Sequence, residues 1–346
     1  MRPTPLILKT VIPEDWPGLS AAFRDLTLEQ SLTYSLAAAK RIGADAQFIV
    51  LSTPDGHPVA AACLRLKRIP GLGRGIAWIA AGPMMLRQGQ PDPDPETMRA
   101  VLAALREYAQ GAGHILRLRL PTPARHDNAT LDQLAAAEGF SPTDRSAVYR
   151  TVLIDCDQEE EVLMRALHGK WRNPLRNALK SGMELEYIPI ADCAARFDAL
   201  YREVQAAKGF SPDIPPEFYY PLEGPDFTHE VLIARKDGAD IAGMTIGYTG
   251  QNAVYLFGAT SEIGRRLNAG HYLMWHSVLR CRDLSLKCFD LGGIDPDNNP
   301  SVTRFKQRTG GTDTTAAGPY EFRPRSLSTA FIGAAEALHA RLKEKR

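Results

Sequence analysis

The chain has 346 residues, 44% of them hydrophobic and 23% charged, with a formal net charge of +1. This length suits two domains of about 150 residues or one large domain. The apolar runs are far shorter than the roughly 18 residues of a membrane span, and the N-terminus lacks a secretory signal. Five cysteines and eight histidines show no zinc spacing or disulfide framework. We therefore expect a soluble, cytoplasmic protein without a metal site, and the balanced charge favours a monomer.

Two β-hairpins are predicted at corresponding places in the two halves. Residues 48–64, FIVLSTPDGHPVAAACL, align with residues 230–246, EVLIARKDGADIAGMTI, and the Asp-Gly pairs at 55–56 and 237–238 coincide. In each copy two apolar strands flank the pair, whose glycine supplies the positive φ of a tight turn. The chain therefore contains an internal repeat, unless the match reflects only that any two α+β halves share hairpins and helices.

The same order of elements follows each hairpin. We expect a strand, an amphipathic helix, a second strand, a short helix and a closing strand, at 75–85, 95–113, 114–120, 131–140 and 147–154 in the first half and at 252–260, 269–284, 287–293, 301–311 and 317–322 in the second. This order is the one expected of GNAT-type acyltransferases. It predicts an α+β fold of two tandem GNAT-like domains, each a mixed sheet flanked by helices.

Domain boundaries follow from the repeat. The first domain is expected over 1–154 and the second over 155–325, opening with helices near 158–181 and 193–208. The tail, 326–346, is expected to form a helix docked by one face. Its apolar positions are Leu327, Phe331, Ala334, Ala335 and Leu338.

Three segments of the second half carry a more specific resemblance. They read HGKWRNPLRNALKSGMELE at 168–186, YLFGATSEIGRRLNAGHYLMWHSVLRCRDLSLKCFDLGGIDP at 255–296, and TRFKQRTGGTDTTAAGPYEF at 303–322. Their order and spacing resemble the Fem family of aminoacyl-tRNA-dependent peptidoglycan bridge transferases, and the first half fits that family's first domain more loosely. Trp171, Pro174 and Thr309 depart from the family pattern, and a long helical hairpin for tRNA contact is absent from the sequence.

The first of these segments is basic. Arg172, Arg176 and Lys180 are spaced i, i+4, i+8 and share a helical face, with Asn173 beside them. Guanidinium groups pair with phosphate or carboxylate in bidentate fashion. The resemblance implies that Arg172, Asn173 and Arg176 hold the pyrophosphate of a nucleotide- or lipid-linked acceptor. The alternative is a solvated basic face.

The last segment supplies the expected catalytic group. Aminoacyl transfer to an amine needs no covalent enzyme intermediate, so the enzyme must orient the reactants and stabilise the oxyanion and the leaving ribose hydroxyl. The resemblance to the family's F-K pair assigns this task to Lys306, with Phe305 packing beneath it, and makes Arg304 and Arg308 contacts to tRNA phosphates. The alternative is a surface lysine on a short helix.

Other candidates are tyrosines and one acid. Tyr255 and Tyr272 either bind substrate or belong to the core with satisfied hydroxyls. Tyr219 is implied as an acceptor contact because the run from Lys208-Gly209-Phe210 to Tyr220 resembles the family's R-x-G-F…Y-x-x-L run. Asp290, at a strand end, either orients the attacking amine or caps the Gly-Gly turn that follows.

The function expected from this resemblance is transfer of an amino acid from aminoacyl-tRNA to an amine of a phosphate-linked acceptor such as a peptidoglycan precursor, without a cofactor and with a possible peripheral approach to the membrane. An acyltransferase using acyl-CoA or acyl-carrier protein is an alternative. It is disfavoured because GRRLNAGHYL does not have the usual pyrophosphate-turn spacing and LRQGQPDPDPET is rich in proline, which lacks the N–H donor. A non-catalytic module that binds a cell-wall precursor or nucleic acid is the third possibility.

Overall fold

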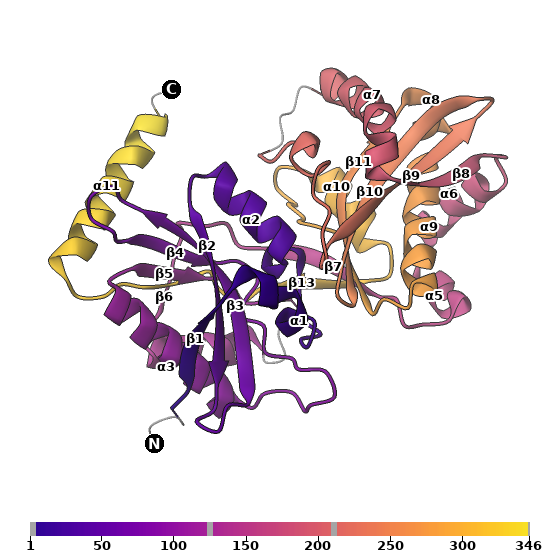
Figure 1. Ribbon diagram of the computed structural model, residues 1–346. Coiled ribbons are helices and arrows are strands. Elements are labelled where there is room, and N and C mark those ends of the chain that lie inside the picture. The colour runs from indigo at the N-terminus through magenta and orange to yellow at the C-terminus, as the bar shows by residue number, and fades with distance from the viewer. Residues whose placement is uncertain (1–4, 123–126, 209–212, 345–346) are drawn as a thin grey trace. The chain divides into compact units, whose positions relative to one another are not determined.

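A computed structural model describes residues 5–122, 127–208 and 213–344. The chain forms two compact units, Met1–Val148 with Thr315–Arg346 and Tyr149–Thr314. Each contains one seven-stranded mixed sheet flanked by helices (Figure 1). The expected tandem GNAT-like α+β architecture is therefore confirmed.

In the first unit the strand order is β1-β2-β3-β4-β5-β14-β6, with β4 and β5 parallel. Its strands are β1 (Ile7–Val11), β2 (Asp45–Ser52), β3 (Pro58–Arg68), β4 (Gly75–Ile79), β5 (Ile115–Leu118), β6 (Ser141–Pro142) and β14 (Tyr320–Phe322). Its helices are α1 (Trp16–Ser20), α2 (Leu32–Arg41), α3 (Pro95–Ala112), α4 (Asn128–Ala137) and α11 (Leu327–Glu344).

In the second unit the order is β13-β7-β12-β11-β10-β9-β8, with β11 and β12 parallel. Its strands are β7 (Arg150–Asp155), β8 (Glu184–Pro189), β9 (Thr228–Lys236), β10 (Ala239–Thr249), β11 (Asn252–Thr260), β12 (Cys288–Asp290) and β13 (Thr312–Thr315). Its helices are α5 (Glu160–Ala166), α6 (Gly169–Leu179), α7 (Ile190–Lys208), α8 (Glu262–Arg266), α9 (Ala269–Asp283) and α10 (Pro300–Gln307).

The closing strands of the two halves are exchanged between the sheets. Strand β7, from the end of the first half, pairs with β12, while β14, from the end of the second half, pairs with β5. The unit boundaries therefore differ from the expected division at 154/155 and 325/326. The partner of a strand is set by non-local hydrogen bonds and by side chains such as the buried ion pair of Arg117 and Glu321, which a local pattern does not specify.

Local predictions agree well with the structure. The two hairpins are β2–β3 and β9–β10, and the φ values of Gly56 and Gly238 are +92° and +82°, as their turns require. The helix expected at 158–181 is instead two helices, α5 and α6. His168 causes the break, because it has extended backbone and its side chain accepts a hydrogen bond from the backbone N–H of Lys170 at 3.1 Å.

The C-terminal helix forms as expected but docks by a different face. Leu327 and Phe331 are 93% and 58% exposed, whereas Ile332 is buried. Glu336 accepts two hydrogen bonds from the Arg117 guanidinium, each 2.7 Å long. The spacing of apolar residues did not predict this docked face because part of the contact is the ion pair between Glu336 and Arg117.

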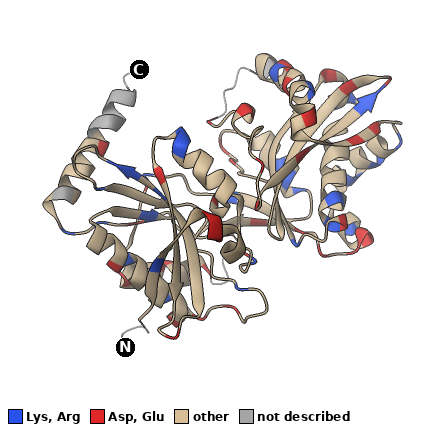
Figure 2. Cartoon of the chain, in the orientation of Figure 1, with Lys and Arg blue, Asp and Glu red and all other residues tan. Residues whose placement is uncertain are grey.

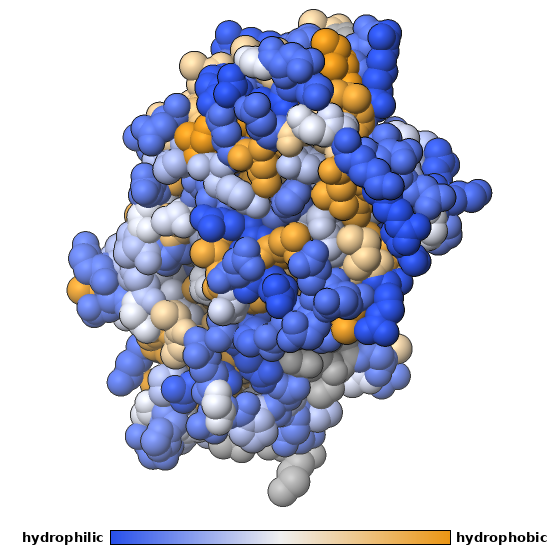
Figure 3. Space-filling view, turned by 90° about the vertical axis from the view of Figure 1, so that its right-hand side faces the viewer, coloured by the Kyte–Doolittle hydropathy of each residue, from blue (hydrophilic) through white to orange (hydrophobic). Residues whose placement is uncertain are grey.

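Charged residues of both signs occur along the elements of each unit (Figure 2). The face drawn in Figure 3 is mostly hydrophilic and is broken by separate hydrophobic patches. Within the described ranges, no helix combines the length and hydropathy needed to cross a bilayer.

Candidate functional site

The candidate site lies in the second unit, where strand β12 ends and its parallel neighbour β11 continues. The register of β11 with β12 runs from Asn252↔Cys288 to Val254↔Asp290, where β12 ends, while β11 continues to Thr260. A pocket of about 300 Å³ opens beside this continuation. Its lining includes Tyr255, Gly258, Thr260, Arg265, Asn268, His271, Phe305 and Lys306.

A glycine turn closes the strand end beside the pocket. Asp290 accepts hydrogen bonds from the Gly292 backbone N–H at 2.8 Å and from the Tyr149 hydroxyl at 3.0 Å. Gly292 has φ +72°, and a Cβ there would lie 3.0 Å from the Tyr255 carbonyl oxygen. Of the two roles considered for Asp290, the structure shows the capping of this turn.

Lys306 lies on the inner face of α10 and is 5% exposed. Its ammonium donates to the carbonyl oxygens of Gly292 and Gly293 at 3.3 and 3.0 Å and lies 5.0 Å from the centre of the Tyr255 ring. Burial lowers its pKa from 10.5 to about 8, against the opposing effect of the Asp290 carboxylate. The residue is therefore a desolvated cation in the pocket wall, not a surface lysine.

An aromatic cluster supports the lysine. The half-buried Phe305 ring lies 5.0 Å from His271 and 5.6 Å from the buried Trp171, and these last two rings are 4.8 Å apart. Burial lowers the pKa of His271 to about 4, so this imidazole is neutral at pH 7. His271 was not among the site residues expected from the sequence. The sequence feature that could have indicated a role for His271 in the pocket is its position in the first turn of α9.

The N-terminus of α9 also borders the pocket. Asn268 precedes the helix with φ +58°, and Arg265 donates to the Thr260 carbonyl oxygen at 2.9 Å. Backbone N–H groups and the helix dipole make such a terminus favourable for anions. From the sequence, this GRRLNAGHYL stretch was expected only to be an imperfect pyrophosphate turn, and Arg265 and Asn268 were not predicted to line the pocket.

The basic face of α6 is separate from the pocket lining. Arg176 and Asn173 are exposed, while Arg172 is half-buried and donates to the Leu167 carbonyl oxygen at 2.9 Å. The buried Nε of Arg172 has no acceptor within the described ranges. The structure therefore joins α6 to the lysine pocket through Trp171, not through the arginines.

The remaining expected site residues divide into two groups. Tyr255 lines the pocket, whereas Tyr272 is a core residue whose hydroxyl donates to the Met183 carbonyl oxygen at 3.3 Å. The Tyr219 ring packs edge-on against Phe257, with centroids 5.3 Å apart. Residues 209 and 210 of the motif that pointed to Tyr219 lie outside the described ranges.

Two arginines flank Lys306 in the sequence, Arg304 on α10 and Arg308 directly after its last residue. Arg304 is exposed and Arg308 half-buried. Both are two positions from Lys306, so they share the face of the helix opposite the lysine.

Comparisons with known proteins agree with this architecture. A family model described as an acetyltransferase (GNAT) domain matches residues 166–307. A lipid II:glycine glycyltransferase from Staphylococcus haemolyticus is 25% identical over 99 residues, which are 29% of this chain and 23% of that protein. The match thus spans about a quarter of the relative's length.

Solved structures are similar over nearly the whole chain. The crystal structure of FemX has a TM-score of 0.75 at 16% identity and covers 92% of this chain and 97% of its own. The C-terminal domain of a putative lysylphosphatidylglycerol synthetase from Agrobacterium fabrum has a TM-score of 0.52 at 14% identity, covering 94% of this chain and 95% of its own. At these identities the likeness concerns the fold.

Proposed function

We propose that this Fem-like tandem GNAT protein is an aminoacyltransferase that moves an amino acid from aminoacyl-tRNA to an amine of a phosphate-linked acceptor. The observation that carries the proposal is the buried ammonium of Lys306 beside the point where β12 ends and β11 continues. A buried cation is costly to keep, and this one lies in the segment that resembles the family's F-K pair.

The chemistry follows from the donors of Lys306. An ammonium has three N–H donors, and two of them are directed to the carbonyls of Gly292 and Gly293. The third is available for the oxyanion that forms when the acceptor nitrogen attacks the ester carbonyl carbon. The C–N bond forms, the C–O bond to the tRNA ribose breaks, and the ribose oxygen takes up a proton released by the amine. A fixed cation in a desolvated site stabilises this charge strongly.

The acceptor side of the proposal rests on α6 and the tyrosines. The exposed Arg176 guanidinium and the neighbouring Asn173 amide offer a cation and N–H donors to phosphate, while Tyr255 borders the lysine pocket. Arg304, on the outer face of α10, and Arg308, directly after this helix, are assigned to tRNA phosphates. Tyr272 no longer belongs to the proposed site because its hydroxyl is used in the core.

The peptidoglycan acceptor is proposed from similarity. The relative that matches 29% of this chain is named for glycine transfer to lipid II, a phosphate-linked precursor. A precursor stem peptide therefore supplies the acceptor amine in our proposal.

An acyl-CoA-dependent acyltransferase is a second candidate because of one observation. The N-terminus of α9 and Arg265 border the same pocket as Lys306, an arrangement suited to a pyrophosphate. Release of free thiol from acyl-CoA in the presence of acceptor would favour this candidate.

The deciding experiment uses purified full-length protein, a pool of radiolabelled aminoacyl-tRNAs and a nucleotide-linked stem-peptide acceptor. We expect label to move to the acceptor, RNase treatment of the donor pool to abolish the transfer, and Lys306→Met to reduce it by at least about 100-fold, as for loss of an oxyanion donor. Transfer that survives RNase, or that Lys306→Met leaves unchanged, would contradict the proposal.

A further inference from the structure

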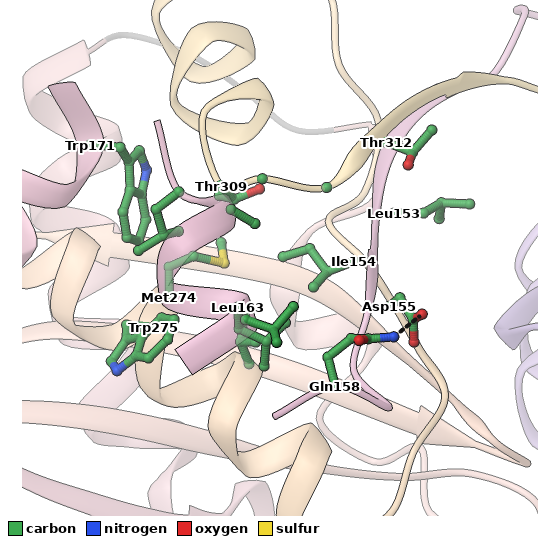
Figure 4. Close-up of a pocket in the computed structure, with 16 residues that line it drawn as sticks. Leu153, Ile154, Asp155, Gln158, Leu163, Trp171, Met274, Trp275, Thr309 and Thr312 are labelled. Atoms are coloured by element: carbon green, nitrogen blue, oxygen red, sulfur yellow. Dashed lines mark hydrogen bonds between the residues drawn. The ribbon is translucent and has the colours of Figure 1, made fainter. Parts of the chain in front are cut away.

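A second pocket, of about 200 Å³, lies in the second unit apart from Lys306 (Figure 4). Strand β7, helices α5 and α9 and the turn after α10 form its walls. Most side chains in the lining are apolar, including Ile154, Leu163, Leu167, Trp275 and Val278. A pocket of this volume exceeds the roughly 150 Å³ cavity that accommodates benzene in another protein.

One polar group in this apolar wall lacks an acceptor. Trp171 is 2% exposed, and its indole N–H has no hydrogen-bond partner in the described part of the chain. In Figure 4 the indole nitrogen lies on the edge of the ring turned toward the pocket. A buried donor without an acceptor costs about 1–3 kcal/mol, so a ligand that supplies an acceptor gains a hydrogen bond here.

We propose that this pocket binds a small uncharged molecule that carries one ring-sized apolar group and one carbonyl-type oxygen, which accepts the hydrogen bond of Trp171. Charge in the lining supports a neutral ligand. The ionisable side chain of the lining is Asp155, whose carboxylate accepts from the Gln158 side-chain amide at 2.9 Å and from the Asp157 backbone N–H at 3.0 Å. This carboxylate disfavours an anion, and the apolar wall disfavours a cation.

The second pocket shares a wall with the lysine pocket. Met274 lines both, and the Trp171 ring contacts His271 and Phe305, which line the first. A ligand that fixes the Trp171 ring therefore acts on the aromatic support of Lys306. Through this contact the pocket acts as an effector site in our proposal, whichever acyl donor the protein uses.

The test uses two probes of nearly equal shape, acetophenone and α-methylstyrene, in which a carbonyl oxygen is replaced by a methylene group. Titration of the full-length protein is followed by the indole N–H signals in ¹⁵N-TROSY spectra, assigned with Trp171→Phe and Trp275→Phe. We expect acetophenone to shift the Trp171 signal and to bind roughly 3- to 10-fold more tightly than α-methylstyrene, the range of one net hydrogen bond.

Two variants complete the test. Trp171→Phe keeps an aromatic wall but removes the donor, so it should lose the preference for acetophenone, whose carbonyl oxygen would then be buried without a hydrogen bond. Trp275→Phe, in the same lining, should retain the preference for acetophenone. Equal affinity of the wild-type protein for the two probes, or a Trp171 signal that does not move at saturating acetophenone, would overturn the proposal.

Discussion

At the scale of single residues, the position of Lys306 is a compromise between stability and chemistry. The inner face of α10 places it between the buried Thr303 and Thr309, where an apolar side chain would cost less. Its lowered pKa expresses this cost, because the charged form is disfavoured in the folded protein relative to the unfolded chain. Active sites commonly retain such destabilising groups.

Lys306→Met should therefore abolish transfer while raising the free energy of unfolding at pH 7 by about 1–3 kcal/mol. The gain is fully present below about pH 8 and shrinks as the pH rises through 10.5, above which the wild-type lysine is neutral in both states. Urea denaturation at pH 7 and pH 10 measures it. Lys287→Met, at an exposed lysine paired with Asp157, is the matched control and should change stability by less than about 0.5 kcal/mol. A destabilised Lys306→Met protein at pH 7 would show that the lysine is structural.

Transfer should also have an alkaline limit set by Lys306. With saturating substrates the single-turnover rate is expected to fall above about pH 8, because the ammonium that stabilises the oxyanion loses its proton. Lys306→Arg keeps the charge at this pH, so its residual rate should lack the fall. The rates must be corrected for uncatalysed ester hydrolysis. A wild-type rate that stays level to pH 9.5 would argue against this role.

At the scale of elements, α6 has two faces with different tasks. Trp171, Leu175 and Ala178 are buried, while Asn173 and Arg176 face outward. Arg172 lies between these faces, and its hydrogen bond to the Leu167 carbonyl holds the junction of α5 and α6. Its two possible roles, structural and substrate-binding, can be separated by comparison with Arg176.

Arg176→Ala should raise the KM for a phosphate-bearing acceptor by about 10-fold or more with little change in kcat or stability, the expected loss of one charge-assisted hydrogen bond. Arg172→Ala should raise KM as well, and should lower the free energy of unfolding by about 1 kcal/mol through the lost Leu167 contact. Steady-state kinetics with phosphorylated and dephosphorylated acceptors provide the measurement. The exposed Arg165 on α5 is the control, and its alanine variant should behave as wild type. If all three alanine variants have the KM of the wild-type protein, α6 does not bind the phosphate of the acceptor.

At the scale of the whole molecule, the exchange of β7 and β14 makes each sheet depend on a strand from the other half of the sequence. In β7, Val152 and Ile154 belong to the core of the second unit. Burial of each contributes about 1.5–3 kcal/mol, a large part of the 5–15 kcal/mol by which domains are typically stable.

Fragments test this organisation directly. The fragment 149–314 contains all seven strands of the second sheet except the last residue of β13. It should give a dispersed NMR spectrum and unfold cooperatively. Residues 155–325, the division expected from the repeat, lack most of β7 and should not. Circular dichroism during thermal unfolding distinguishes the two. If the fragment 155–325 folds as well as 149–314, β7 is dispensable and the strand exchange does not contribute to the stability of the second unit.

The sequence by itself determined what local patterns encode. The Asp-Gly hairpins, the order of strands and helices and the tandem GNAT-like fold could be predicted because alternation, amphipathic periodicity and turn glycines act over a few residues. Similarity of motifs singled out Phe305 and Lys306, which the structure brings together with Tyr255 in one pocket.

Only the tertiary structure decided which strands pair, which face of α11 docks and how deeply Lys306 is buried. It also assigned Tyr255 to the pocket and Tyr272 to the core, although the sequence offered both equally as substrate contacts. These outcomes depend on contacts between residues far apart in the chain, such as Arg117 with Glu321 and Glu336. Their free energies arise when the partners meet, so no stretch of sequence around either partner specifies them.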